Sequence, residues 1–249
     1  MAGTGSICPD NSMNERDRTE GGTSLLEVLV ATAAGLIILA ATMQAISFFQ
    51  RQFTNQQSAL AQQQDLRLSL ELLEQELHLA ASDAVSIMKQ DELEFGANVN
   101  GLFTTVTAPA MAGQTTITVD DGREWPERKT IQVCWNERCE AMTLARDGQR
   151  ALLTVTEPIS ATIPAGAVVS VRNRVRYYSR RDDRGNLRFL RMVDGGASVL
   201  IGDVHEVRFS YWDGQGRPVV QAASVRRIVV EMSLRGSSTK TVREISLRV

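Results

Sequence analysis

The sequence predicts an α+β protein in which one long N-terminal helix packs on a C-terminal antiparallel β domain. An uncharged apolar run extends from Val28 to Phe49, and the more polar stretch after it contains no glycine or proline up to about residue 82. After about residue 84 the pattern changes to short β-rich runs separated by turn sequences. We therefore expect a helix at 23–83 and a β-rich globular domain at 84–249.

The composition is that of an ordinary globular chain. Of 249 residues, 43% are hydrophobic and 22% are charged, which excludes a disordered or collagen-like chain. The formal net charge of −2 gives no whole-chain electrostatic argument for binding nucleic acid or an acidic membrane surface. Cys8 lies in the polar N-terminal stretch, so removing that stretch would leave Cys134 and Cys139 as a pair. An even pair favours an oxidising compartment.

The apolar run is long enough to cross a membrane. At 1.5 Å per residue, Val28 to Phe49 extends over roughly 33 Å, and a bilayer core is roughly 30 Å thick. We predict one membrane-spanning helix at about 25–49, with a cleaved signal peptide and a plain uncleaved anchor as alternatives. Glu27 lies near the start of this segment, where an ionised carboxylate costs a few kcal/mol and therefore needs a partner.

The residues around Gly22 resemble a known processing signal. Gly22, then Thr23-Ser24-Leu25-Leu26-Glu27 and the apolar run, is similar to the class III prepilin signal of type IV pilins and type II secretion pseudopilins. The resemblance implies a leader at 1–22, cleavage after Gly22 by a prepilin peptidase, and methylation of the new N-terminus at Thr23. Cleavage after Gly21 would not place Glu27 at the fifth mature position that the family requires.

The same resemblance implies a role for Glu27 and a location for the protein. In the family, the glutamate neutralises the N-terminal amine of a neighbouring subunit, here that of Thr23, as the filament takes in a new pilin. The expected location is the cytoplasmic membrane, with the C-terminal domain outside the cytoplasm. Thr23 replaces the usual phenylalanine, and the leader is long and acidic, whereas a start at Met13 rather than Met1 would give a leader of the usual short type.

The second half of the predicted helix carries an apolar stripe. Leu66, Leu70, Leu73 and Leu77 recur at spacings of four, three and four, which places them on one helix face. A coiled coil is the alternative, but the glutamine-rich stretch before them lacks sustained apolar heptads. We expect the stripe to pack against the chain's own β domain.

The β domain is predicted from runs rich in β-branched and aromatic residues, with Asp- and Gly-rich turns between them. These runs lie at 115–119, 130–135, 139–144, 151–156, 167–179, 186–193, 204–212, 224–234 and 241–249. The stretches 58–82 and 198–219 resemble PilW-type minor pilins and, more loosely, GspJ-type minor pseudopilins. This implies a structural subunit in priming or capping a type IV pilus, with a type II secretion pseudopilin as the alternative. An alternative of another class is a membrane-anchored extracytoplasmic ligand-binding domain.

The sequence VCWNERCE predicts a hairpin with its turn at Asn136-Glu137. Cys134 then lies opposite Cys139 in a non-hydrogen-bonded pair, where side chains approach most closely. Together with the expected export, this favours a cross-strand disulfide over free thiols. A metal site is disfavoured because the C-x4-C spacing has no second ligand pair.

No catalytic motif is present. His78 and His205 have no acid-base or metal constellation around them in the sequence, and no P-loop or nucleophile elbow occurs. We therefore expect no enzyme activity, no cofactor and no metal. The acidic stretches 182–186 and 213–217 are interpreted as turns, because neither has the spacing of a calcium loop.

The one basic concentration lies at 172–191. Arg172, Arg174 and Arg176 alternate in a predicted strand and share one face, whereas Val175 and Tyr177 lie on the other, as does Val171. The basic face and its tyrosines are also compatible with DNA phosphates and bases. Without a groove-reading motif or a net positive charge, a solvated sheet face is favoured over DNA binding.

Overall fold

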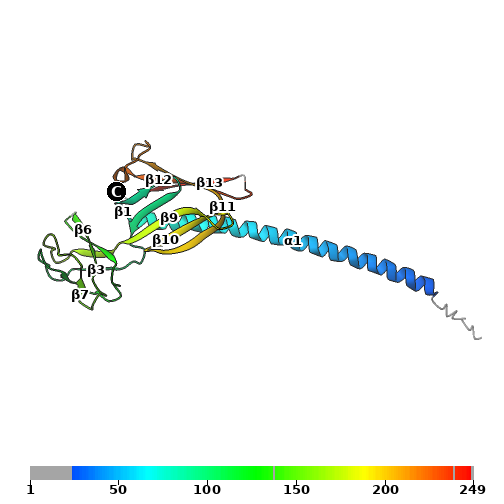
Figure 1. Cartoon of the computed structure of the whole chain (residues 1–249), viewed down its shortest axis with the longest axis horizontal. Coiled ribbons are helices and arrows are strands. Elements are labelled where there is room, and N and C mark those ends of the chain that lie inside the picture. The colour runs from blue at the N-terminus through cyan, green and yellow to red at the C-terminus, as the bar shows by residue number, and fades with distance from the viewer. Residues whose placement is uncertain (1–23, 137, 238, 248–249) are drawn as a thin grey trace, which may run out of the picture. The chain divides into compact units, whose positions relative to one another are not determined.

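A computed structural model of the chain describes residues 24–136, 138–237 and 239–247, with the backbone alone for 81–84. The chain divides into two compact units, one ending at residue 57 and the other comprising 58–249, and each is described by itself. The predicted α+β fold is confirmed: one long helix is followed by antiparallel sheets (Figure 1).

The helix α1 (Leu25–His78) is shorter at its C-terminal end than predicted. The sequence Ala80-Ala81 favours helix, but Ala80 instead begins the strand β1 (Ala80–Met88) and pairs with Ala97. Pairing in the sheet thus overrides the local helix propensity, which is a weak preference of a few tenths of a kcal/mol per residue.

The main sheet contains seven antiparallel strands in the order β1-β2-β9-β10-β11-β12-β13. Besides β1, its strands are β2 (Glu92–Ala97), β9 (Asn173–Arg181), β10 (Leu187–Val193), β11 (Gly196–Trp212), β12 (Arg227–Leu234) and β13 (Lys240–Ser246). Five of these match predicted runs, although β11 begins earlier and Arg172 separates β9 from the strand before it. The strands β1 and β2 were not predicted.

The sheet curls around the C-terminal part of α1 (Figure 1). The long strand β11 pairs with β10 through its first half and with β12 through its second half. In that second half, the backbone N–H of Phe209 donates to the carbonyl of Gln90 at the β1–β2 turn, at 2.7 Å. Strands that are distant in the sheet order are thereby brought together over the helix.

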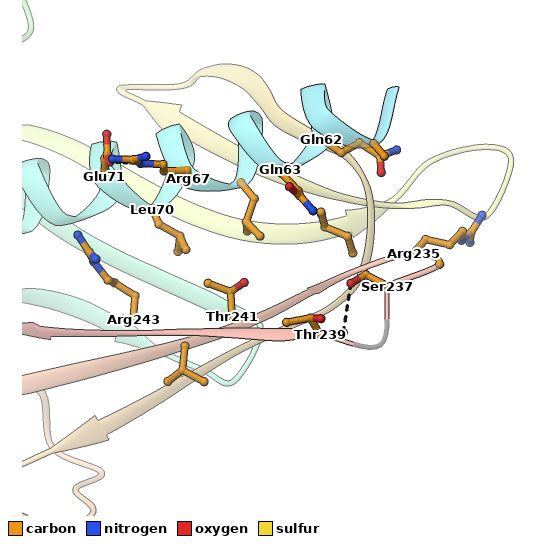
Figure 2. A pocket seen from close by; sticks show the side chains of 15 residues that line it. Gln62, Gln63, Arg67, Leu70, Glu71, Arg235, Ser237, Thr239, Thr241 and Arg243 are labelled. Carbon is orange, nitrogen blue, oxygen red and sulfur yellow. Dashed lines mark hydrogen bonds and ion pairs between the residues drawn. The ribbon is translucent and has the colours of Figure 1, made fainter. Parts of the chain in front are cut away.

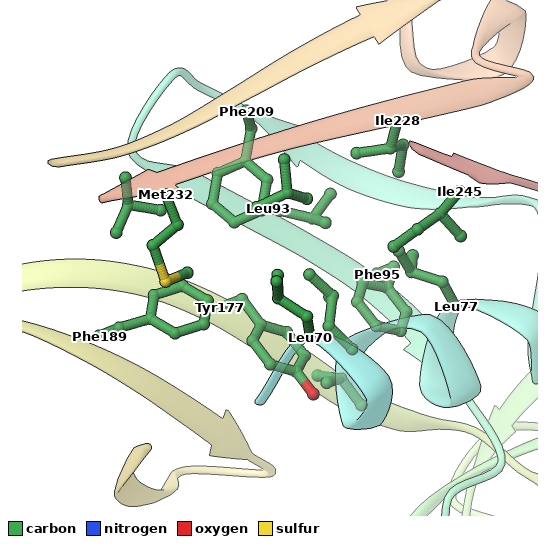
Figure 3. Close-up of a cluster of buried hydrophobic side chains, with 14 of the residues drawn as sticks. Leu70, Leu77, Leu93, Phe95, Tyr177, Phe189, Phe209, Ile228, Met232 and Ile245 are labelled. Atoms are coloured by element: carbon green, nitrogen blue, oxygen red, sulfur yellow. The ribbon is translucent and has the colours of Figure 1, made fainter. Parts of the chain in front are cut away.

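The core of this unit lies between α1 and the sheet, as the leucine stripe predicts (Figure 3). Leu66, Leu70, Leu73 and Leu77 are all buried, so the prediction that they pack on the chain's own β domain is confirmed. Opposite them lies a row of stacked and tilted aromatic rings: Phe95, Tyr177, Phe189 and Phe209.

Residues 98–172, between β2 and β9, form a second β structure with its own core. Its strands are β3 (Phe103–Thr105), β4 (Thr116–Thr118), β5 (Thr130–Trp135), β6 (Arg138–Thr143), β7 (Leu152–Thr154) and β8 (Val168–Val171). Four strands pair in the order β3-β8-β5-β6, and β4 pairs with β7. Bridges between Val106 and Val119 and between Leu144 and Val155 join the two sheets at both ends. The strands therefore close into a small barrel, hereafter the inserted barrel, and closure protects sheet edges.

The inserted barrel leaves the main sheet at a single point. Ala97, the last residue of β2, pairs with Asn173, the first residue of β9. The Asn173 side chain accepts from the N–H of Val99 at 3.2 Å and donates to Asp194 at 2.8 Å. Asp194, in the β10–β11 turn, also pairs with Lys129 of the inserted barrel. Burial acts to raise the pKa of Asp194, but the hydrogen bonds that it accepts outweigh this and hold the pKa below its ordinary value.

Candidate functional site

The predicted processing site lies at the edge of the described chain. The leader, with Cys8, Gly22 and Thr23, falls outside the described residues, which begin at Ser24. The carbonyl of Ser24 accepts from the N–H of Glu27 at 2.8 Å and from that of Val28 at 3.2 Å. Glu27 therefore lies in the first turn of α1.

The Glu27 carboxylate is exposed and placed where a helix favours negative charge. The unpaired N–H groups of the first turn carry a partial positive charge that stabilises a carboxylate there. Within residues 24–57, no side chain forms a hydrogen bond or ion pair with Glu27. Within the described part of the chain, nothing prevents a cation of another molecule from approaching the Glu27 carboxylate.

The apolar segment of α1 is not covered by the described protein. Its most apolar window has a mean hydropathy of 2.2 and is 0% buried, and this helix is long and apolar enough to cross a membrane. The hydroxyl groups in and beside the segment donate to carbonyls three or four residues earlier in the helix: those of Thr32, Thr42, Ser47 and Thr54. Polar groups bonded in this way are tolerated in a lipid environment, because they need no water.

The two faces of this segment differ in side-chain size. At 3.6 residues per turn, small side chains share the face of Glu27: Ala31, Ala34, Ala41 and Ala45, with Ile38 among them. The opposite face carries large side chains with Thr32 and Ala40 between them: Leu25, Leu29, Leu36, Leu39 and Met43. Beyond Ala45, Phe49 lies on the Glu27 face. Small residues permit close approach of a second helix in a membrane, so the Glu27 face is suited to helix–helix packing.

The second half of α1 is held to the sheet by a buried polar cluster that the sequence analysis missed. Glu76 is only 4% exposed. It accepts from the Tyr177 hydroxyl at 2.6 Å and from the Arg191 Nε at 3.0 Å, and a further short contact joins it to Arg191 Nη2. Burial, and then the negative charge of Glu76, raise the pKa of Tyr177 above its ordinary value. A glutamate within the leucine stripe was the available signal, because charged residues are rarely buried without a partner.

A second, more exposed ion pair joins the helix to the last strand. Glu74 lies at the margin of the buried face of α1 and pairs with Arg243 of β13 at 2.6 Å. Both side chains retain access to water, with 28% of Glu74 and 46% of Arg243 exposed. This pair is therefore screened in a way that the Glu76 cluster is not.

The predicted basic face is paired with acidic residues of the neighbouring strand. Arg174 pairs with Glu94 at 2.8 Å, and Arg176 pairs with Glu92 at 2.7 Å. Arg172 lies across Gly96, where a Cβ would approach its Nε to 2.3 Å. Val175 and Tyr177 are buried on the other face, as predicted, and the carboxylates lower the positive potential of the arginine face.

The predicted disulfide is present. Cys134 pairs with Cys139 across β5 and β6, with Trp135 opposite Arg138, and the Cα atoms are 4.1 Å apart. Glu137 of the predicted turn lies outside the described residues. The bond ties together two strands of the inserted barrel.

The two acidic stretches form turns, as predicted. Asp182 accepts from the N–H groups of Arg184 and Asn186, and Asp213 accepts in the same pattern from those of Gln215 and Arg217. These bonds lower the pKa of both aspartates.

The two histidines are placed by single elements. His78 ends α1 and is half-buried, and His205 is exposed on β11. Among the residues described, no group of three or more His, Cys, Asp or Glu side chains is arranged to hold a metal ion.

No protein-family model, curated protein or solved structure matches the chain at a significant level. The architecture of one long apolar helix followed by an antiparallel β domain is pilin-like.

Proposed function

We propose that the chain is a minor type IV pilin that acts as a structural subunit in pilus assembly. A prepilin peptidase would cleave after Gly22 and the new N-terminus at Thr23 would be methylated. Residues 25–49 would anchor the protein in the cytoplasmic membrane with the β domain outside. The partners would be other pilins, in contact through the N-terminal helix, and the chain itself would catalyse no reaction.

Glu27 is the observation that carries this proposal. It is the one ionisable residue in an apolar segment that no described part of the protein covers, and it shares its face with alanines. A carboxylate in hydrocarbon is stabilised by a nearby cation, because Coulomb attraction grows as the dielectric constant falls. The amine of Thr23 in a neighbouring subunit would supply that cation, at a distance set by close packing of the alanine faces.

The division of α1 into an uncovered half and a packed half supports the same proposal. Residues from Leu66 to Leu77 are fixed in the β domain by the leucine stripe and the Glu76 cluster. The first half of α1 is apolar and uncovered, and the second half is packed in a folded domain. This arrangement is suited to a subunit that is held in a membrane before it assembles through its helix.

Intact mass measurement and N-terminal sequencing of membrane-extracted protein test the proposal, in cells with and without the prepilin peptidase. We expect a mature chain that begins at methylated Thr23 only when the peptidase is present. A Gly22→Ala variant serves as the uncleaved control. An unprocessed wild-type chain in both strains would overturn the proposal and favour a membrane-tethered β domain.

A further inference from the structure

The last strand, β13, is a free edge of the main sheet. The other edge strand, β1, contacts the short 3-10 helix η1 (Ala222–Ser224), whereas β13 is hydrogen-bonded to β12 alone. The N–H of Leu247 donates to the carbonyl of Arg226 at 2.8 Å, and this bond fixes the phase of the hydrogen bonds between β12 and β13.

This bond determines which backbone groups of β13 point outward. Hydrogen-bonded pairs alternate along an antiparallel ladder, so Thr241, Arg243 and Ile245 direct their N–H and C=O groups toward β12. The N–H and C=O groups of Val242 and Glu244 therefore point away from β12. Among the described residues none accepts from either N–H.

The outer side chains of β13 carry opposite charges on the two sides of Val242. Val242 is 56% exposed, with Lys240 two residues before it and Glu244 two residues after it. Lys240 pairs with Glu231 of β12 at 2.6 Å. Glu244 pairs with Arg227 of β12 at 2.9 Å. The free edge thus presents a cation, an apolar residue and a carboxylate in that order.

Open space lies beside this strand on the helix side (Figure 2). A groove of about 650 Å³ separates α1 from the β12–β13 hairpin. Leu66 and Leu70 line it from the helix, and Thr241 and Arg243 line it from β13. The inward side chains of a strand added to β13 would therefore have room.

We propose that β13 is a self-association edge on which a second copy of this chain adds its own β13 antiparallel, centred on Val242. In that register Val242 lies opposite Val242 of the second copy, and its outward N–H and C=O groups form a hydrogen-bonded pair. Lys240 of each copy lies opposite Glu244 of the other. Charges of alternating sign then follow one another across β12 and β13 of one copy and β13 and β12 of the other. They are Arg227 and Glu244 of the first copy, then Lys240 and Glu231 of the second copy.

The order of charges favours a second copy over an unrelated strand. An antiparallel strand with the opposite order of charges would place like charges together, which is destabilising. The order Lys-x-Val-x-Glu is complementary to itself about a two-fold axis, which is the requirement for an isologous dimer. Edge strands carrying charge are normally protected from pairing, but here the charge pattern allows pairing with one specific partner.

Charge reversal and its rescue test the proposal. The oligomeric state of the full chain in a non-ionic detergent is measured by sedimentation velocity across a concentration series. We expect a monomer–dimer equilibrium that Lys240→Glu or Glu244→Lys alone weakens at least 10-fold. The fourfold variant R227E/E231K/K240E/E244K, which restores opposite charges both within each copy and between the copies, recovers dimerisation. Glu206→Lys, an ion-pair reversal on β11 away from this edge, leaves the equilibrium unchanged.

Two further variants separate edge pairing from association through the apolar helix. Val242→Pro removes an outward N–H that β12 does not use, so it abolishes the dimer but leaves the near-ultraviolet circular dichroism of the monomer unchanged. In a Cys8→Ser background, Val242→Cys forms an intermolecular disulfide, because opposite Cα atoms in such a pair lie about 5.5 Å apart. A monomer at every concentration, or a dimer insensitive to V242P, would overturn the proposal. Neither result bears on processing after Gly22.

Discussion

Glu76 is a charged residue that the helix buries among leucines. It lies between Leu73 and Leu77 in the stripe that faces the sheet, and it is stabilised by Tyr177 and Arg191, both more than 100 positions away in sequence. Removing one partner of such a buried cluster leaves an uncompensated charge, whereas removing an exposed ion pair has little effect. Glu76 and Glu74 therefore form a matched test on one helix.

We expect Glu76→Ala to lower the free energy of unfolding by about 3–5 kcal/mol, because Arg191 and Tyr177 lose their shared acceptor inside the core. Glu74→Ala breaks only the exposed pair with Arg243 and should cost about 0.2–1 kcal/mol. Urea titration of both full-length variants in detergent, followed by near-ultraviolet circular dichroism, measures the difference. Equal effects of the two substitutions would show that the cluster contributes no more than a surface ion pair.

Tyr177 makes the stability of the domain dependent on alkaline pH. Its folded-state pKa is raised by burial and by Glu76, so the folded chain keeps the phenol neutral at a pH where the unfolded chain ionises. The stabilisation is fully present below the unfolded pKa of about 10 and decreases above it, by up to about 1.4 kcal/mol per pH unit. Burial also raises the pKa of Tyr211, so Tyr177→Phe should remove part of this pH dependence and not all of it.

Unfolding midpoints of wild type and Tyr177→Phe between pH 8 and 11 measure this difference. The lysine and arginine residues are common to both chains and cancel in the comparison. Parallel curves for the two proteins would be evidence against the role assigned to the Tyr177 hydroxyl.

Glu27→Ala tests the proposed assembly role of the apolar segment. The substitution makes the segment more apolar, so membrane insertion should be unaffected, and cleavage after Gly22 should still occur. Recovery of the protein in sheared pili should fall sharply, because no carboxylate remains to neutralise the N-terminus of a neighbour. Leu29→Ala, on the opposite helix face, provides the control. Normal incorporation of Glu27→Ala into pili would contradict the assembly role.

The α1 helix and most strands were predictable because their signals are local. The leucine spacing identified the buried face of α1, and the VCWNERCE pattern gave the register of β5 and β6 with its disulfide. The strands β1, β2 and β3 were not predicted. In β2, Glu92 and Glu94 have side chains that are normally exposed to solvent. These two carboxylates are buried because Arg174 pairs with Glu94 and Arg176 pairs with Glu92. Pairing between residues so far apart in the chain leaves no local signal in the sequence.

The inserted barrel was not predictable from the pattern of strands. Its strands alternate in burial as those of the main sheet do, so the sequence shows where strands occur and not which sheet they join. The bridges that close the barrel, such as that between Val106 and Val119, join segments distant in the chain, and such pairings have no local signature. Assembly at Glu27 was expected from the sequence, whereas the Glu76 cluster depends on contacts distant in the chain.

The main sheet should fold without the inserted barrel. Ala97 and Asn173 are already paired at the point where residues 98–172 leave the sheet, so a two-residue turn such as Asn-Gly can join the two strands. The two structures also have separate cores. We expect the shortened chain to insert in the membrane and to retain a cooperative thermal transition within about 10 °C of the wild type, since few contacts beyond that of Lys129 with Asp194 are lost.

Differential scanning calorimetry of the shortened chain in detergent measures that transition. Its control is Lys129→Ala, which removes the contact with Asp194 but keeps the barrel. Loss of the cooperative transition in the shortened chain alone would show that the barrel is part of the folding unit.

The single point of attachment also determines how the domain would respond to tension. A pull on the inserted barrel passes to the sheet through Ala97 and Asn173, and so along β2 and β9 in the same direction. The hydrogen bonds that join these two strands to their outer neighbours, β1 and β10, are then loaded in shear and share the force along their length. Strands pulled in this geometry do not unzip one bond at a time. The inserted barrel is thus attached where the sheet offers high mechanical resistance to being pulled apart.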